Sequence, residues 1–122
     1  MEGYDMSELQ MGVIEAQFAE IIWECEPVSG AELVKKAEAA FNWKRTTTYT
    51  VLKRLCDKGI FQNDGGTVTS RMSREEYYAH RSNQYVEETF HGSLPAFFAA
   101  FTRGKPLTED EREEIRRMID EC

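Results

Sequence analysis

A run of small hydroxyl and long cationic side chains lies between residues 43 and 59, at a spacing typical of one helix face. Thr48, Leu52 and Leu55 form an apolar stripe at helical spacing. Side chains outside this stripe can reach base edges and phosphates when a helix enters the major groove of DNA. The candidate DNA-contacting residues of this segment are Lys44, Arg45, Thr46, Thr47, Thr50, Lys53 and Arg54. Because consecutive β-branched threonines are poor helix formers, we interpret the segment as a DNA-reading helix rather than an ordinary solvated helix surface.

The segments before this reading helix predict two further helices that would position it. Ser29 and Glu32 have the spacing of a capping box, which opens a helix. The apolar side of that helix consists of Leu33, Val34, Ala37, Ala40 and Phe41. The short linker Asn42–Trp43 then leads into the reading helix, as in a helix-turn-helix. An earlier helix is expected from about Val13 to Cys25. Its apolar stripe consists of Ile14, Phe18, Ile21, Ile22 and Cys25.

The segment from Phe61 to Arg71 predicts a small β-hairpin. Asn63-Asp64-Gly65-Gly66 is a hairpin turn signal, and short strand candidates flank it. Three helices followed by such a hairpin form a winged helix-turn-helix, so the expected fold class is mainly α with a small β-hairpin. Arg71 is the first cation after the turn and joins the candidate DNA contacts. The expected DNA-binding domain covers residues 1–72.

Several short motifs occur in a fixed order along the chain. Val28–Leu33 opens the second helix, and the reading helix carries the pattern Thr-x-x-Thr-x-Leu-Lys-Arg-Leu over residues 47–55. Further motifs are Ser73–Tyr77, Phe90–Leu94 and Leu107–Glu111. Together these motifs resemble the penicillinase-repressor family, over most of the chain. The resemblance implies a bacterial dimeric repressor, with winged domains that bind a palindromic operator in double-stranded DNA and C-terminal helices that pair the subunits.

Three departures from the family pattern bear on function. Relatives usually carry basic residues near the hairpin tip, whereas this hairpin has no cation until Arg71, which predicts weaker wing contacts. In relatives that respond to β-lactams, induction cuts an Asn-Phe bond between the second and third of the C-terminal helices. This chain has Ala100-Phe101 there, so release by cleavage is not expected. Copper-responsive relatives carry a C-terminal cluster of cysteines, and because Cys122 stands alone here, no copper site is expected.

The charge of the chain is unevenly distributed, and the distribution agrees with nucleic-acid binding better than the total does. The formal net charge is -7, which by itself argues against an anionic partner. Residues 1–34 carry eight acids and no base, and residues 83–122 carry nine acids and five bases. Residues 35–82 carry ten bases and five acids. Because fields act over roughly one Debye length, about 8 Å, this basic third can attract phosphate while the acidic remainder weakens non-specific binding.

The C-terminal third, residues 73–122, predicts a helical dimerisation region. Helices are expected from about Arg74 to Phe90, around Leu94–Phe101, and after a capping box formed by Thr108 and Glu111. The candidate dimerisation residues are Tyr78, Tyr85, Phe90, Leu94, Phe97, Phe98, Phe101, Ile115, Met118 and Ile119. About 50 residues cannot close a core of their own without help. A second copy of the chain is the expected partner, and packing back on the winged domain is the alternative.

The remaining reactive residues point to no catalytic or metal chemistry. Cys25 and Cys56 lie on or beside core stripes, and the chain has no Cys-x-x-Cys, no signal peptide and no long apolar run. A reduced, cytoplasmic protein without a membrane segment is expected, and a thiol-sensing role for Cys56 stays open. His80 and His91 are too isolated for a metal site, no cofactor is expected, and no enzyme signature is present. The alternative to a DNA-binding regulator is a helical adaptor that binds an acidic protein.

Overall fold

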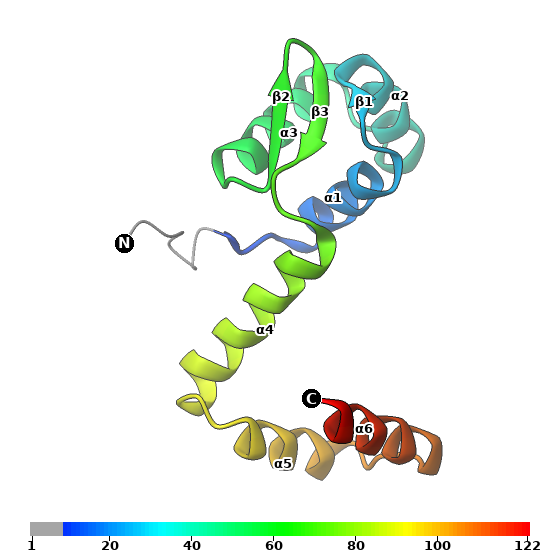
Figure 1. Cartoon of the computed structure of the whole chain (residues 1–122). Coiled ribbons are helices and arrows are strands. Elements are labelled where there is room, and N and C mark those ends of the chain that lie inside the picture. The colour runs from blue at the N-terminus through cyan, green and yellow to red at the C-terminus, as the bar shows by residue number, and fades with distance from the viewer. Residues whose placement is uncertain (1–8) are drawn as a thin grey trace. The chain divides into compact units, whose positions relative to one another are not determined.

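The computed structural model describes residues 9–122, and Figure 1 shows their helices and strands. The chain divides into two compact units between Ser82 and Asn83. We call residues 9–82 the head and residues 83–122 the tail. The division lies beyond the functional boundary expected after residue 72, because Tyr77 is buried in the head core. That functional boundary stays a prediction, which truncation can test.

The head contains the three helices that the sequence predicts, α1 (Val13–Cys25), α2 (Gly30–Phe41) and α3 (Arg45–Asp57). The hydroxyl oxygen of Ser29 accepts the backbone N–H of Glu32 at 3.0 Å and so caps α2. Figure 1 shows α2 and α3 as consecutive helices beside the strands. The expected helix-turn-helix order is therefore confirmed, with α3 in the place of the reading helix.

The strands form a small antiparallel sheet in the order β1-β3-β2. They are β1 (Val28–Ser29), β2 (Phe61–Asp64) and β3 (Thr67–Ser70). The turn between β2 and β3 consists of Gly65 and Gly66, with φ of 59° and 98°, which only glycine adopts without strain. The expected hairpin is thus confirmed. The pairing of β1 with β3 was not expected, because two residues are too short to show strand alternation.

The head core combines apolar side chains from all these elements. Its largest fully buried members are Phe18, Phe61, Leu9, Ile22, Leu33, Leu55, Ile60 and Val68. The expected apolar stripes are wrong at Ile14 and Ala40, which are exposed. Helix α1 packs through an arc that includes Ala19, so Ile14 lies outside the contact. Val51 is an additional core residue of α3. The mainly α winged helix-turn-helix is confirmed.

The remaining helices are α4 (Arg74–Phe90), which belongs to both units, and α5 (Leu94–Gly104) and α6 (Glu109–Glu121) in the tail. The start of α6 is a complete capping box. The N–H of Glu111 donates to the hydroxyl of Thr108 at 3.1 Å, and the N–H of Thr108 donates to the carboxylate of Glu111 at 3.0 Å. The capping box that the sequence predicts at this position is therefore confirmed.

The tail is held together by aromatic contacts but buries little. The rings of Tyr85, Phe90 and Phe97 form a cluster with centroid separations of 5.6–6.0 Å, which ties the end of α4 to α5. No residue of α5 or α6 is buried. The large exposed apolar side chains of these two helices are Leu94, Phe98, Phe101, Met118 and Ile119.

Candidate nucleic-acid interface

The exposed face of α3 carries the hydroxyls that the sequence analysis singled out. Thr46, Thr47 and Thr50 are exposed, whereas Thr48 points inward and is almost fully buried. The Thr48 hydroxyl donates to the carbonyl of Lys44 at 3.1 Å, which satisfies its polar atom inside the core. The helix therefore separates an apolar face that packs on the head from a hydroxyl face that meets solvent.

The threonines of this face offer different chemistry to a base. The Thr50 hydroxyl donates to the carbonyl of Thr46 at 2.9 Å, so its proton is already used within the helix. Its oxygen can still accept from an amino group of adenine or cytosine, and its methyl group can contact thymine. Thr47 has no such internal bond among the described residues, so its hydroxyl can donate or accept.

The start of α3 is fixed by aromatic packing that sequence reasoning missed. Asn42 ends α2 in the left-handed conformation, with φ of 58°. Trp43 follows, and its ring lies 4.7 Å from that of Phe41 and 5.3 Å from that of Phe18 between centroids. Because Trp43 packs against the core, it holds the linker between α2 and α3 in one geometry. A tryptophan within a short polar linker was the available signal.

A second missed contact positions Arg45. Its guanidinium carbon lies 5.2 Å from the ring centroid of Tyr49, a cation–π contact one turn along α3. Tyr49 in turn lies against Gly30, the first residue of α2, where a Cβ atom would be 2.7 Å from the Tyr49 hydroxyl oxygen. Gly30 thus makes room for the ring that orients Arg45, and a larger residue would displace it.

The cations at the two ends of α3 differ in whether they form ion pairs. Lys44 and Arg45 are exposed at its N-terminus, and no ion pair within residues 9–122 involves either of them. The helix dipole also favours an anion at this end. Near the C-terminus, Lys53 pairs with Asp57 at 3.0 Å. Arg54 pairs with Glu15 of α1 at 3.6 Å. The N-terminal end is therefore the better prepared to accept a phosphate.

The hairpin contributes little positive charge. Asp64 ends β2 directly before the turn, and the Asn63 side chain accepts the N–H of Gly66 at 2.9 Å, which fixes the tip. Arg71 is exposed and follows β3, so it lies at the end of the hairpin away from the turn. Its backbone N–H donates to the carbonyl of Ile60 at 2.8 Å. Arg71 is therefore separated from the tip of the hairpin, as its position in the sequence after the turn predicts.

The candidate dimerisation residues fall into both units. Tyr78 belongs to the head, where its hydroxyl donates to Glu20 of α1 at 3.0 Å and its ring lies 6.3 Å from that of Trp23. Arg74 lies over the Tyr78 ring and also binds Glu20 at 2.8 Å. The remaining candidates belong to the tail. Tyr78 therefore has a contact of its own with α1, which the sequence did not indicate.

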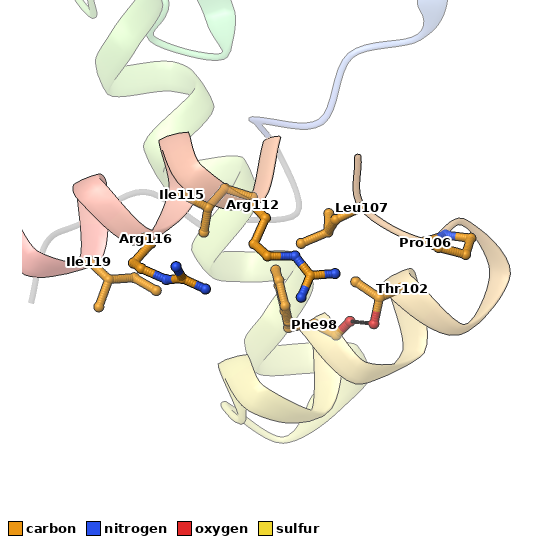
Figure 2. A pocket seen from close by; sticks show the side chains of 8 residues that line it. All are labelled: Phe98, Thr102, Pro106, Leu107, Arg112, Ile115, Arg116 and Ile119. Atoms are coloured by element: carbon orange, nitrogen blue, oxygen red, sulfur yellow. Dashed lines mark hydrogen bonds between the residues drawn. The ribbon is translucent and has the colours of Figure 1, made fainter. Parts of the chain in front are cut away.

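The tail contains an open groove between α5 and α6, which Figure 2 shows from close by. Its volume is about 430 Å³, and the residues that line it are Phe98, Thr102, Pro106, Leu107, Arg112, Ile115, Arg116 and Ile119. In Figure 2, the side chains of Ile115 and Ile119 lie on the same side of α6, beside the two arginines. Three of the candidate dimerisation residues, Phe98, Ile115 and Ile119, are thus brought together here.

All three cysteines are free, and the two partly buried thiols, Cys25 and Cys56, do not show the properties of reactive sites. Burial raises the pKa of the Cys56 thiol, and neighbouring Asp57 raises it further. Burial likewise raises the pKa of Cys25. A raised pKa lowers the thiolate fraction, which is the nucleophilic form. Within residues 9–122 there is no cluster of three metal-ligating side chains, and no helix there is long and apolar enough to cross a membrane.

Comparisons with known proteins cover nearly the whole chain. A family model described as penicillinase repressor matches residues 11–121. The penicillinase repressor of Bacillus licheniformis is 22% identical over 116 residues, which are 92% of this chain and 91% of that protein. The methicillin resistance regulatory protein MecI of Staphylococcus aureus strain Mu50 is 21% identical over 120 residues, 95% of this chain and 98% of that protein. The protein of the same name from Mammaliicoccus sciuri is 20% identical over the same shares.

Proposed function

The chain belongs to the penicillinase repressor family, whose members are DNA-binding transcriptional repressors, and from this premise we propose that it binds a palindromic operator as a homodimer. The resemblance found in the sequence is thereby confirmed. The observation that carries the proposal is the exposed hydroxyl face of α3, which the buried residues Thr48, Leu52 and Leu55 fix against the head core. We place the protein in the cytoplasm, where its DNA target is accessible.

In this proposal α3 enters the major groove, and its residues divide into base-reading and phosphate-contacting sets. Thr46, Thr47 and Thr50 read base edges, because they are short and exposed on one helix face. The phosphate contacts come from Lys44, Arg45, Lys53 and Arg54, with Arg71 at the base of the hairpin. The N-terminal cations, Lys44 and Arg45, form no ion pair with any residue of 9–122, and they make the larger contribution.

The tail supplies the second half of the proposal. Helices α5 and α6 expose apolar side chains and bury none, so a second copy can cover them in a symmetric interface. A two-fold dimer carries two reading helices, and such dimers bind half-sites one helical turn, about 34 Å, or a multiple of it apart. Pairing of two tails therefore explains why the target would be a palindrome.

The test is a salt titration of binding to duplex DNA. Selection from genomic fragments first yields the preferred duplex, and binding is then measured from about 50 to 200 mM salt. We expect a palindromic consensus and a steep fall in affinity with salt, because several phosphates release counterions. Polyglutamate of equal charge is the matched competitor for the adaptor alternative. A chain that binds polyglutamate as tightly as the selected duplex would overturn the proposal in favour of an acidic protein partner.

We further propose that release from DNA does not depend on cutting at Ala100-Phe101. Both residues lie within α5, whose helical backbone must unfold locally before a protease can bind it. Differential affinity of another partner or ligand for the DNA-free form would then drive release. Mass spectrometry of the protein from cells exposed to a β-lactam tests this. A fragment ending at Ala100 that accompanies derepression would contradict it.

A further inference from the structure

Glu15 lies in the first turn of α1 but contacts the far end of α3. Its side chain is only 18% exposed, and its carboxylate lies 3.2 Å from the Lys58 ammonium and 3.6 Å from the Arg54 guanidinium. It also accepts the backbone N–H of Gly12 at 3.2 Å. Glu15 is not one of the residues proposed above to read bases or to contact phosphates. One carboxylate of α1 thus holds two cations of the DNA-facing segment.

The two cations are held to different degrees. Lys58 is largely buried, and it also donates to the carbonyl of Gln10 at 2.6 Å, so it has a structural role at this junction. Arg54 is 59% exposed and makes the longer contact with Glu15. It lies one turn beyond Thr50 and two turns beyond Thr47, on the same side of α3 as the proposed base-reading residues. Arg54 can therefore exchange Glu15 for a phosphate, whereas Lys58 cannot do so as easily.

We propose that Glu15 competes with DNA phosphates for Arg54 and so limits how tightly the head binds any duplex. The inference rests on the proposed binding of DNA through α3. A carboxylate beside the guanidinium neutralises part of its charge, and it also repels a phosphate that approaches. Because phosphate contacts carry little sequence information, the effect is on affinity and salt dependence and not on the choice of bases. Glu15 is thus an affinity-determining residue that need not touch DNA.

The experiment compares Glu15→Gln with the unchanged full-length chain on the selected duplex and on a scrambled duplex. Glutamine keeps an oxygen that can accept from Gly12 and Lys58, and it removes the charge. We expect binding to both duplexes to tighten by about twofold to fivefold, as for a partly exposed ion pair. The salt slope should steepen by up to about one unit, since Arg54 then neutralises a phosphate more fully. The preference for the selected duplex should stay unchanged.

Two further variants separate this effect from a general change of charge. Glu24→Gln removes the same charge from the same helix at an exposed position, and it should leave affinity nearly unchanged. In a chain that also carries Arg54→Ala, Glu15→Gln should no longer tighten binding, because the competing cation is gone. Equal tightening by Glu24→Gln, or tightening that survives Arg54→Ala, would overturn the inference.

A third measurement covers the case in which Glu15→Gln does not fold, as judged by thermal unfolding. Arg54→Ala alone should then weaken binding less than Arg45→Ala, because Arg54 already shares its charge with Glu15 and Arg45 has no ion pair among the described residues. A larger loss for Arg54→Ala contradicts the inference. If the unchanged chain binds no duplex at all, both the proposed function and the inference about Glu15 fail. If it binds with normal salt dependence and Glu15→Gln does not tighten binding, only the inference fails.

Discussion

The head and the tail solve the problem of burying apolar surface in different ways. The head closes a core from α1, α2, α3, the sheet and the first turns of α4, with Tyr77 as its last member. In the tail, α5 and α6 bury no residue, although they carry Phe98, Phe101 and Ile119. The head can therefore fold from contacts within one chain, whereas the tail reaches a comparable state only when another surface covers it. In the proposed dimer, the unit that would bind DNA has a closed core of its own, and the unit that would pair the two chains does not.

The largest expected effect comes from separating the two units. A chain ending at Ser82 keeps Tyr77 and should be a folded monomer. We expect its operator affinity to fall about 100-fold or more, because the second head no longer binds at high effective concentration. Sedimentation and duplex binding measure this.

A chain ending at Met72, the functional boundary expected from the sequence, tests whether the head needs the first turn of α4 to fold. It loses the Tyr77 ring, which lies 5.8 Å from that of Trp23, and the hydroxyl that donates to the carbonyl of Leu9 at 3.0 Å. Loss of a buried aromatic side chain typically costs about 3–5 kcal/mol, so this shorter head should be largely unfolded. A full chain that sediments as a monomer at micromolar concentration would contradict the comparison between the units.

A single substitution in the tail should reproduce part of that loss. Ile119→Asp places a charge on the exposed apolar face of α6, and we expect about 2 kcal/mol weaker dimerisation, as at an interface hot spot. The head should keep its thermal unfolding midpoint, because Ile119 belongs to the other unit. Arg117→Gln lowers the net charge of α6 by the same one unit at an exposed position outside the groove, and it is the control. Equal dissociation by both variants would show that the change of charge, and not the loss of apolar contact at Ile119, weakens the dimer.

The sequence predicted the elements whose signals are local. Caps at Ser29 and Thr108 and the Gly65-Gly66 turn involve neighbouring residues, so a single chain segment is enough to find them. Strand β1 and the pairing of Glu15 with Arg54 join residues far apart in the sequence, and no periodicity indicates such pairs. The exposed face of α3 could be predicted because it consists of the residues that lie outside the apolar stripe, and that stripe recurs at helical spacing. The details that position this face depend on tertiary contacts and could not be found in that way.

Within the head, the threonines should control which operator is preferred. Thr47→Ala and Thr50→Ala each remove one hydroxyl from the exposed face of α3, and we expect changes of about 1–3 kcal/mol at the disturbed base pair. Lys44→Ala should instead weaken all duplexes uniformly and reduce the salt slope by about one unit. Binding to a set of singly substituted operators measures both. Unchanged preference in both threonine variants would mean that another face of α3 meets the bases.

A smaller effect is expected from Gly30, where α2 approaches the Tyr49 ring. Gly30→Ala would bring a Cβ atom to 2.7 Å from the Tyr49 hydroxyl oxygen, so the ring must move. We expect a destabilisation of about 1 kcal/mol and weaker duplex binding, because Arg45 loses its position over that ring. Gly104→Ala in the tail has open space around its Cβ and is the control. Thermal unfolding and duplex binding together distinguish a shift of Arg45 from loss of fold. If a destabilised Gly30→Ala variant binds the duplex with unchanged affinity, the contact between Arg45 and the Tyr49 ring does not contribute to DNA binding.

The smallest effect concerns the acid stability of the head. Partial burial of Glu15 opposes its ionisation, but the Gly12 N–H, Lys58 and Arg54 outweigh this and hold its pKa below the ordinary value of 4.5. A carboxyl group whose pKa is lowered by folding stabilises the folded state above its unfolded-state pKa, and this contribution is lost as the pH falls through the folded-state pKa. The unchanged head should therefore be more stable than Glu15→Gln at pH 7, by up to about 1 kcal/mol. Because glutamine does not titrate, the difference should shrink below pH 4.5 and vanish in stronger acid. Urea unfolding of the chain ending at Ser82 at several pH values measures it without a contribution from the tail. A difference that stays constant down to low pH would mean that Glu15 stabilises the head by packing and not by its charge, and the account of its contact with Arg54 would then lose its electrostatic basis.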